Sequence, residues 1–159
     1  MRFLPENNVS MIVDSFLELQ KKYNINDKLY IVGKENIYFN KNIKPKIKNK
    51  TNIVFLGPIY DRKKLMDVWN SADYYIHGHS VGGTNPTLVE ALSVGIPIFA
   101  FNVMFNKKII GKDGKYFSNK NDLIDLIRKK AFINYKLNID SEQFSEKYIN
   151  EGYLSLIKS

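Results

Sequence analysis

The sequence predicts an α/β fold in which parallel strands form a sheet with helices on both faces. Short apolar runs alternate along the chain with longer stretches whose apolar residues recur every three or four positions. Strands joined through helices of this length form right-handed crossovers, which produce a parallel, Rossmann-like sheet. The 159 residues contain no internal repeat, low-complexity segment or obvious linker, so we expect a single domain over residues 1–159.

The first expected element is an amphipathic helix whose apolar residues lie between Val9 and Tyr23. Pro5 precedes this helix, and Asn7 or Asn8 is expected to cap it. The helix begins so early in the chain that residues 2–4 can form only the end of a preceding strand.

Five apolar runs are expected as strands. Residues 28–33 (KLYIVG) and 52–57 (NIVFLG) are short, apolar and end in glycine, which is typical of buried strands. The lysine-rich segment 34–50 between them is expected to form a short helix and a loop. Later strands are expected at residues 73–76 and 96–101, with a short one at 116–117.

Four further helices are expected. Asp61 is a candidate cap for a helix that carries the apolar residues Leu65 to Trp69. Another helix occupies residues 86–94 and stops at Gly95. The last two are expected to begin at Asn119 or Asn121 and at Asp140, where Asp140 and Gln143 form a candidate capping box for a helix to about Ile157.

The composition limits the partners that are expected. The net charge is +8, from 24 Lys and Arg against 16 Asp and Glu, but only three of the basic residues are arginines. A general bias toward lysine, asparagine and isoleucine accounts for this charge, whereas a functional interpretation is attraction to a nucleotide or an acidic membrane surface. Nucleic-acid readers favour arginine and carry recognisable motifs, so we expect no nucleic-acid partner.

Several classes of protein and site are not expected. Cysteine is absent, which excludes disulfides and cysteine nucleophiles. No apolar run of about 18 residues and no secretory signal occurs, so we expect a cytoplasmic protein. With two histidines in all, a metal site is not expected, and His79 is instead expected near a sugar or phosphate. The dinucleotide fingerprint G-x-G-x-x-G and the P-loop are both missing.

The glycine-rich segment after the third expected strand, residues 77–86 (HGHSVGGTNP), is the main site candidate. Ligands of open α/β sheets bind at the carboxyl ends of the strands. Gly82 and Gly83 allow the backbone to approach a ligand closely, and Asn85 and Pro86 are typical of a helix start. The free amide groups at such a start bind a diphosphate well. A tight strand-to-helix turn without a ligand is the alternative.

Glu90 is the second site candidate. It follows Pro86 by four residues, so both lie on one face of the expected helix, and helical side chains lean toward the amino end. A carboxylate beside a phosphate is unfavourable, so Glu90 would serve a neutral pair of hydroxyls such as those of a ribose. The alternative is a solvated surface residue.

Several segments together resemble a known family. Residues 90–97 (EALSVGIP) resemble the EA-x-x-x-G-x-P signature of GT-B glycosyltransferases of the family 4 type. Residues 55–57 (FLG) resemble a strand end of that family, and Arg2 with residues 5–7 (PEN) resembles its opening GR-x-x-PE-K segment. The loop HSVGGTNPTLVEAL is closer to a rhamnosyltransferase-like subgroup. The resemblance covers nearly the whole chain and implies the C-terminal, donor-binding half of a GT-B fold.

Two positions depart from the pattern of this family. The family usually has a glutamate eight residues before its ribose-binding glutamate, where this sequence has Gly82. The lysine of the opening segment, a phosphate contact in the family, falls on Asn7. The resemblance therefore implies that Arg2 and the backbone of Gly83, Thr84, Asn85 and Pro86 bind the diphosphate and that Glu90 binds the ribose.

The resemblance also implies an activity. GT-B enzymes of this type transfer a sugar, here rhamnose if the subgroup holds, from a nucleoside diphosphate to a polysaccharide or lipid-linked acceptor with retention of configuration. No metal or other cofactor is expected, because the helix dipole and basic groups neutralise the leaving diphosphate. A basic surface would suit peripheral contact with the inner face of the membrane.

The second half of such an enzyme is expected as a partner. The acceptor-binding N-terminal domain would be supplied in cis or in trans, together with the acceptor-side catalytic residues. We therefore expect the 159-residue chain to be inactive in transfer by itself. A non-catalytic nucleotide-binding or interaction module of flavodoxin-like fold stays open as the alternative, and measurements of nucleotide binding and turnover distinguish the two.

Overall fold

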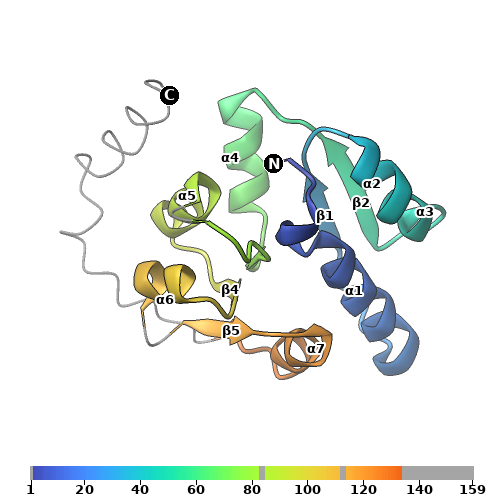
Figure 1. Ribbon diagram of the computed structural model, residues 1–159. Helices are drawn as coiled ribbons and strands as arrows, with labels where there is room; N and C mark the ends of the chain where they lie inside the picture. The colour runs from blue at the N-terminus through green and yellow to red at the C-terminus, as the bar shows by residue number, and fades with distance from the viewer. Residues whose placement is uncertain (1, 83–84, 112–113, 134–159) are drawn as a thin grey trace.

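The computed structural model describes residues 2–82, 85–111 and 114–133 and shows parallel strands flanked by helices (Figure 1). The predicted α/β class is confirmed. In the first part of the chain the elements follow the order η1 (Pro5–Asn7), α1 (Val9–Tyr23), β1 (Leu29–Val32), α2 (Ile37–Asn42), α3 (Lys44–Ile47) and β2 (Ile53–Gly57). The second part contains α4 (Arg62–Asn70), β3 (Tyr75–His77), α5 (Pro86–Val94), β4 (Ile98–Phe101), α6 (Met104–Ile110), β5 (Lys115–Phe117) and α7 (Lys120–Arg128).

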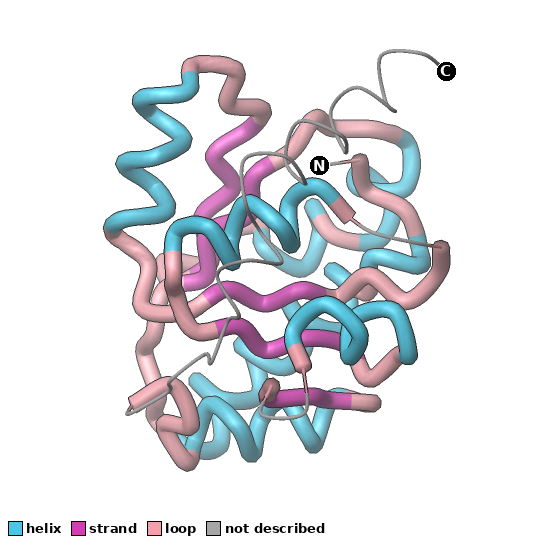
Figure 2. The backbone as a smooth tube through the Cα atoms, turned by 90° about the vertical axis from the view of Figure 1, so that its left-hand side faces the viewer, coloured by secondary structure: helices cyan, strands magenta, loops and turns pink. Residues whose placement is uncertain are grey.

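The described strands form two parallel sheets and not the single sheet that was predicted. Strands β1 and β2 pair with Leu29 opposite Ile53, and the other sheet has the order β3-β4-β5. Figure 2 shows the β1-β2 pair set apart from the other three strands. Arg2 forms one isolated parallel bridge with Lys34, just beyond the end of β1. The expected strand end at residues 2–4 is therefore reduced to a single bridge.

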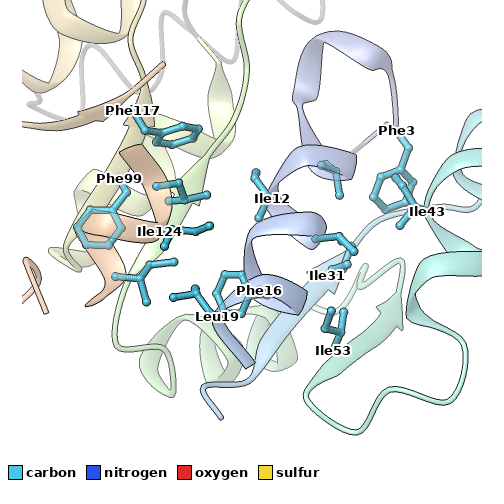
Figure 3. Packing of buried hydrophobic residues seen from close by; sticks show 14 of the residues in the cluster. Phe3, Ile12, Phe16, Leu19, Ile31, Ile43, Ile53, Phe99, Phe117 and Ile124 are labelled. Atoms are coloured by element: carbon cyan, nitrogen blue, oxygen red, sulfur yellow. The ribbon is translucent and has the colours of Figure 1, made fainter. Parts of the chain in front are cut away.

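Two apolar clusters hold the helices against the strands. In β4, Phe99 belongs to the cluster that contains α1 and α7, whereas Ile98 and Ala100 belong to the cluster with α4 and α5. This alternation is the two-residue periodicity of a strand that is covered on both faces. Helix α1 spans both sheets, since Ile12, Phe16 and Leu19 lie between Phe99 and Ile124 on one side and Ile31 and Ile53 on the other (Figure 3).

Side-chain caps fix the starts of three predicted helices. Asp61, Asn85 and Asn119 each accept a hydrogen bond from a backbone amide in the first turn of α4, α5 and α7. The expected cap of α1 is wrong in its detail. Asn8 occupies the N-cap position in the left-handed region, with φ of 53°, and its side chain makes no cap bond. It instead donates to the carbonyl oxygen of Gly78 at 2.8 Å.

Helix α6 was not predicted. Its N-cap, Val103, provides no side-chain bond, and Asn106 interrupts its apolar face although Asn106 is fully buried. The predicted helix from Asp140 lies outside the described residues. Among the residues that the structure describes, no helix is long and apolar enough to cross a membrane.

Candidate functional site

The loop that follows β3 is fastened to the amino-terminal turn η1. The Ser80 amide and hydroxyl both donate to the carbonyl oxygen of Glu6, at 2.9 and 3.0 Å. Gly78 is so close to η1 that a Cβ atom on it would lie 2.2 Å from the Asn7 carbonyl oxygen. Buried Asn106 holds the other side of the loop by donating to the His79 carbonyl oxygen at 3.1 Å. The position of this loop is thus fixed by elements far away in the sequence.

Helix α5 begins directly after this loop, as predicted. The Asn85 side chain accepts a hydrogen bond from the Thr87 amide at 3.0 Å, and Pro86 occupies the first turn. Gly82 is exposed with φ of 89°, a conformation that favours glycine. The predicted site residues Gly83 and Thr84 lie outside the described residues. The predicted helix start is thus present, whereas the anion site itself stays a prediction, because the amides of Gly83 and Thr84 that it needs are not among the described residues.

A cavity of about 620 Å³ opens beside this helix start. Its volume is within the range of roughly 300–1,000 Å³ that is usual for small-molecule sites. Glu90 lines it together with His79, Asn85 and Thr87, and Lys34 reaches it from the end of β1. Glu90 is half-buried. The predicted residues His79, Asn85 and Glu90 are thus brought to one cavity.

Tyr75, His77 and His79 form a chain of polar rings in the cavity wall. Burial, and after it the nearby His79, lowers the pKa of His77 to about 4. His77 Nδ1 and the Tyr75 hydroxyl share a hydrogen bond of 3.1 Å, and the tautomer of His77 sets which of the two donates. Burial, and after it the Glu90 carboxylate, raises the pKa of the Tyr75 hydroxyl, so Tyr75 stays neutral.

Two buried nitrogen atoms at the cavity lack partners. His77 Nε2 and Trp69 Nε1 make no hydrogen bond within the described residues, and both residues line the cavity. Unpaired buried polar atoms are uncommon and costly. A polar occupant of the cavity would satisfy them.

The remaining predicted residues lie at the margin of the site. Arg2 is exposed beside Lys34 and does not line the cavity, and neither do Gly82 and Pro86. Sequence reasoning did not select Lys34 or Tyr75. Lys34 directly follows a glycine at a strand end, which was a usable signal, whereas the side to which Tyr75 points became clear only from the pairing of β3 with β4.

Asn7 has a structural role at this site. Its side-chain amide lies 3.1 Å from His79 Nδ1, and its Oδ1 accepts from the Leu4 amide. Among the described residues, no group of three or more His, Asp or Glu side chains is arranged to hold a metal ion.

A family model described as "Glycosyl transferases group 1" matches residues 1–147, most of the chain. The chain belongs to the group 1 glycosyl transferases. The chain is also similar to Protein CapJ of Staphylococcus aureus, with 26% identity over 137 residues. The match covers 86% of this glycosyl transferase chain and 27% of CapJ, so the chain spans about a quarter of that relative.

Solved structures share the fold of this glycosyl transferase chain. The C-terminal domain of the group 1 protein LpcC from Francisella tularensis aligns with a TM-score of 0.68 and 17% identity, over 99% of this chain and 82% of that domain. Anabaena Alr3699/HepE, which was crystallised with UDP, aligns with a TM-score of 0.74 and 16% identity, over 99% of this chain and 47% of HepE. The predicted fold, that of a GT-B C-terminal domain, is therefore confirmed.

Proposed function

We propose that this chain is the donor-binding part of a glycosyltransferase and binds a nucleoside-diphosphate sugar at the amino end of α5. One observation carries the proposal: the capped start of α5 and the half-buried Glu90 carboxylate belong to the same cavity, at the carboxyl ends of the strands. Structural relatives crystallised with UDP, with UDP and glucose, and with UDP and GlcNAc support this ligand class.

Each part of the ligand has a proposed partner. The diphosphate binds the backbone amides of Gly83 and Thr84, just ahead of α5, because the helix dipole favours negative charge there. Arg2 and Lys34, adjacent at the mouth, add positive charge. Glu90 binds the ribose hydroxyls at a distance from the phosphates, and His79 contacts the sugar or phosphate. No metal takes part in this binding.

The proposal includes the transferred sugar, the stereochemistry of the transfer and the acceptor. The sugar, for which the loop resemblance favours rhamnose, is transferred with retention to a polysaccharide or lipid-linked acceptor. A second domain, in cis or in trans, binds that acceptor, and the chain's coverage of 47% of HepE and 27% of CapJ supports such a domain. The basic surface makes peripheral contact with the cytoplasmic face of a membrane.

The test is a titration of the isotope-labelled chain with UDP, GDP, ADP and dTDP, followed by NMR, with and without EDTA. We expect at least one nucleotide to shift the amide resonances of Thr87, Leu88 and Glu90, and we expect EDTA to change nothing. Shifts confined to other parts of the chain, or no binding by any nucleotide, would contradict the proposal. Binding without transfer by a chain joined to its second domain would favour the non-catalytic module.

A further inference from the structure

The excess positive charge of this chain is confined to one part of the sequence. Residues 28–64 contain ten lysines and arginines against two acidic residues, so their net charge is +8. The rest of the chain has 14 basic and 14 acidic residues and is neutral overall. A general bias in composition would spread the excess over the whole chain. The charged segment is instead one structural unit, β1, α2, α3, β2 and the first turn of α4, so its charge points to an anionic partner.

Helices α2 and α3 give this unit an outward face that is lined with lysine. Phe39 and Ile43 turn inward and are fully buried in the apolar core. On the opposite side, exposed lysines follow at spacings of three and four residues, the spacing that keeps side chains on one helical face. Figure 1 shows α2 and α3 on the side of the molecule opposite α5 and α6. Together with the lysine just ahead of β2, these exposed side chains form the lysine face: Lys41, Lys44, Lys48 and Lys50.

Most cations of the lysine face lack a partner. Within the described part of the chain, the side chains of Lys41, Lys48 and Lys50 form no ion pair and no hydrogen bond. Lys44 pairs with Glu35 at 2.9 Å, but both side chains are exposed, and such pairs are weak. Neighbouring like charges repel each other, so a partner with several negative charges would stabilise the lysine face.

The lysine face adjoins the cavity of the proposed donor site. Lys34 lines that cavity and is exposed, and Glu35 follows it directly. The ion pair between Glu35 and Lys44 therefore ties the start of α3 to the loop beside the cavity. Helix α2 itself begins at Ile37, three residues after Lys34. A long anionic chain on the lysine face would thus reach the cavity at Lys34.

The composition of the lysine face distinguishes between classes of anionic partner. Ile37, 87% exposed, is the one exposed large apolar side chain of α2 and α3, whereas helices that lie in a membrane interface and the centres of protein interfaces present a larger apolar area. Lysine supplies flexible point charges and not the planar fork with which arginine reads bases, which suits repeated charges on a polymer. The membrane contact proposed above fits the start of α4 better, where exposed Tyr60 precedes Arg62, Lys63 and Lys64.

We infer that the lysine face binds a polysaccharide with repeated carboxylate or phosphate groups and leads it toward the cavity, so that the acceptor of this chain is an anionic polysaccharide. The inference rests on the proposed function, because it names the class of acceptor. The second domain holds the hydroxyl group that receives the sugar, and the lysine face holds a more distant part of the same polymer.

The test measures binding of the 159-residue chain to immobilised polygalacturonate and phosphomannan by biolayer interferometry, with neutral dextran for comparison. One variant removes three charges from the lysine face by Lys41→Gln, Lys48→Gln and Lys50→Gln. A matched control removes three exposed charges around α6, β5 and α7 by Lys108→Gln, Lys115→Gln and Lys129→Gln. Vesicles with and without phosphatidylglycerol are measured in the same way, and calorimetric titration with UDP reports on the donor site separately.

We expect the chain to bind at least one of the two anionic polysaccharides at about 50 mM salt, to bind it more weakly at about 300 mM salt, and not to bind dextran. The lysine-face variant should bind about tenfold more weakly and with a shallower salt dependence, whereas the control should keep most of the affinity. Vesicle binding should not depend on the lysine face. Affinity for UDP should be the same in both variants, because none of the six lysines lines the cavity.

No binding to either anionic polysaccharide, or equal losses for the variant and its control, would overturn the inference. So would a lysine-face variant that loses vesicle binding and keeps polysaccharide binding, because the partner would then be a membrane. Polysaccharide binding by a chain that binds no nucleotide would contradict the proposed function and keep the lysine face as a polysaccharide site.

Discussion

Single residues hold the loop after β3 in place through contacts to the amino-terminal turn and the residue that follows it. The Ser80 amide and hydroxyl donate to Glu6, Asn8 donates to the Gly78 carbonyl oxygen, and Asn7 contacts His79. Each of these contacts joins residues 70 or more positions apart in the sequence. This loop leads into α5, so the same contacts position the proposed donor site.

Gly78→Ala tests this attachment. The new Cβ would lie 2.2 Å from a backbone oxygen of Asn7 and 2.9 Å from Ile12 Cδ1, and a backbone atom cannot yield cheaply. We expect a loss of about 3 kcal/mol in the free energy of unfolding. Ser80→Ala, which removes only the hydroxyl bond, should cost about 1 kcal/mol. Urea unfolding measures both losses, and an unchanged Gly78→Ala midpoint would show that the loop is not packed in this way.

His77 should make stability depend on pH. Its pKa is lowered from 6.5 to about 4 by burial and then by His79, so between these values the unfolded chain binds the extra proton. The contribution of neutral His77 to the free energy of unfolding is therefore fully present above pH 6.5, and it is lost as the pH falls toward 4. Between about pH 7 and pH 5 we expect a loss of about 2 kcal/mol.

A His77→Gln variant is the control for this pH dependence, because glutamine does not titrate, and its stability should vary less over the same interval. The pKa of Glu18 is lowered to about 2, chiefly by Lys120 and Lys22, so its effect falls at lower pH and does not interfere. Parallel slopes for the two proteins in urea unfolding at several pH values would contradict the assignment.

At the scale of elements, local sequence signals predicted most starts and ends. Asp61 and Asn85 were selected as caps from residue type and position, and Asn119 was one of two candidates beside Asn121. Asp61, Asn85 and Asn119 each accept a hydrogen bond from a backbone amide. Gly95 ends α5 with φ of 77°. These local sequence signals failed at positions where tertiary contacts determine the structure. Asn8 bonds to Gly78 in place of its own helix, and α6 carries a buried asparagine whose partners are Phe101 and His79.

The caps of α5 and α7 provide a matched pair of variants. Asn85→Ala and Asn119→Ala each remove a side-chain cap and should each cost about 1 kcal/mol of stability. Only Asn85 lines the cavity, so only Asn85→Ala should weaken UDP binding. Calorimetric titration and thermal unfolding of both variants check this. If the two variants change the affinity for UDP equally, the nucleotide does not bind at the start of α5.

At the scale of the whole molecule, the fold class was predictable but the sheet was not. Alternating apolar runs and crossover lengths specify parallel strands with helices, because these are local properties of the sequence. Whether β1 lies beside β3 is set by pairing between residues more than 40 positions apart, which no local pattern encodes. In the same way, Glu90 was selected by its spacing from Pro86, whereas the side to which Tyr75 points followed only from the pairing of β3 with β4.

The whole-molecule account also predicts a separation of binding from transfer. The chain should bind a nucleoside diphosphate but give negligible sugar transfer from UDP-glucose, because acceptor positioning requires the second domain. A chain joined to that domain should transfer sugar under the same conditions, with EDTA present. Product analysis by mass spectrometry measures this, and strong transfer by the 159-residue chain, or a strict need for divalent metal, would contradict it.

The central claim is that Glu90 binds the ribose of a nucleotide whose diphosphate lies at the start of α5. The direct test is calorimetric titration of the original chain and of Glu90→Ala with two ligands, UDP and inorganic pyrophosphate. Two charge-assisted hydrogen bonds to a ribose would be lost, so UDP binding should weaken by about 2–4 kcal/mol, or roughly 30-fold or more. Pyrophosphate has no ribose, and its affinity should stay the same or rise, because a nearby negative charge is removed. Alanine favours the helix, so Tm should hold. Unchanged affinity for UDP, or an equal loss for both ligands, would contradict the claim.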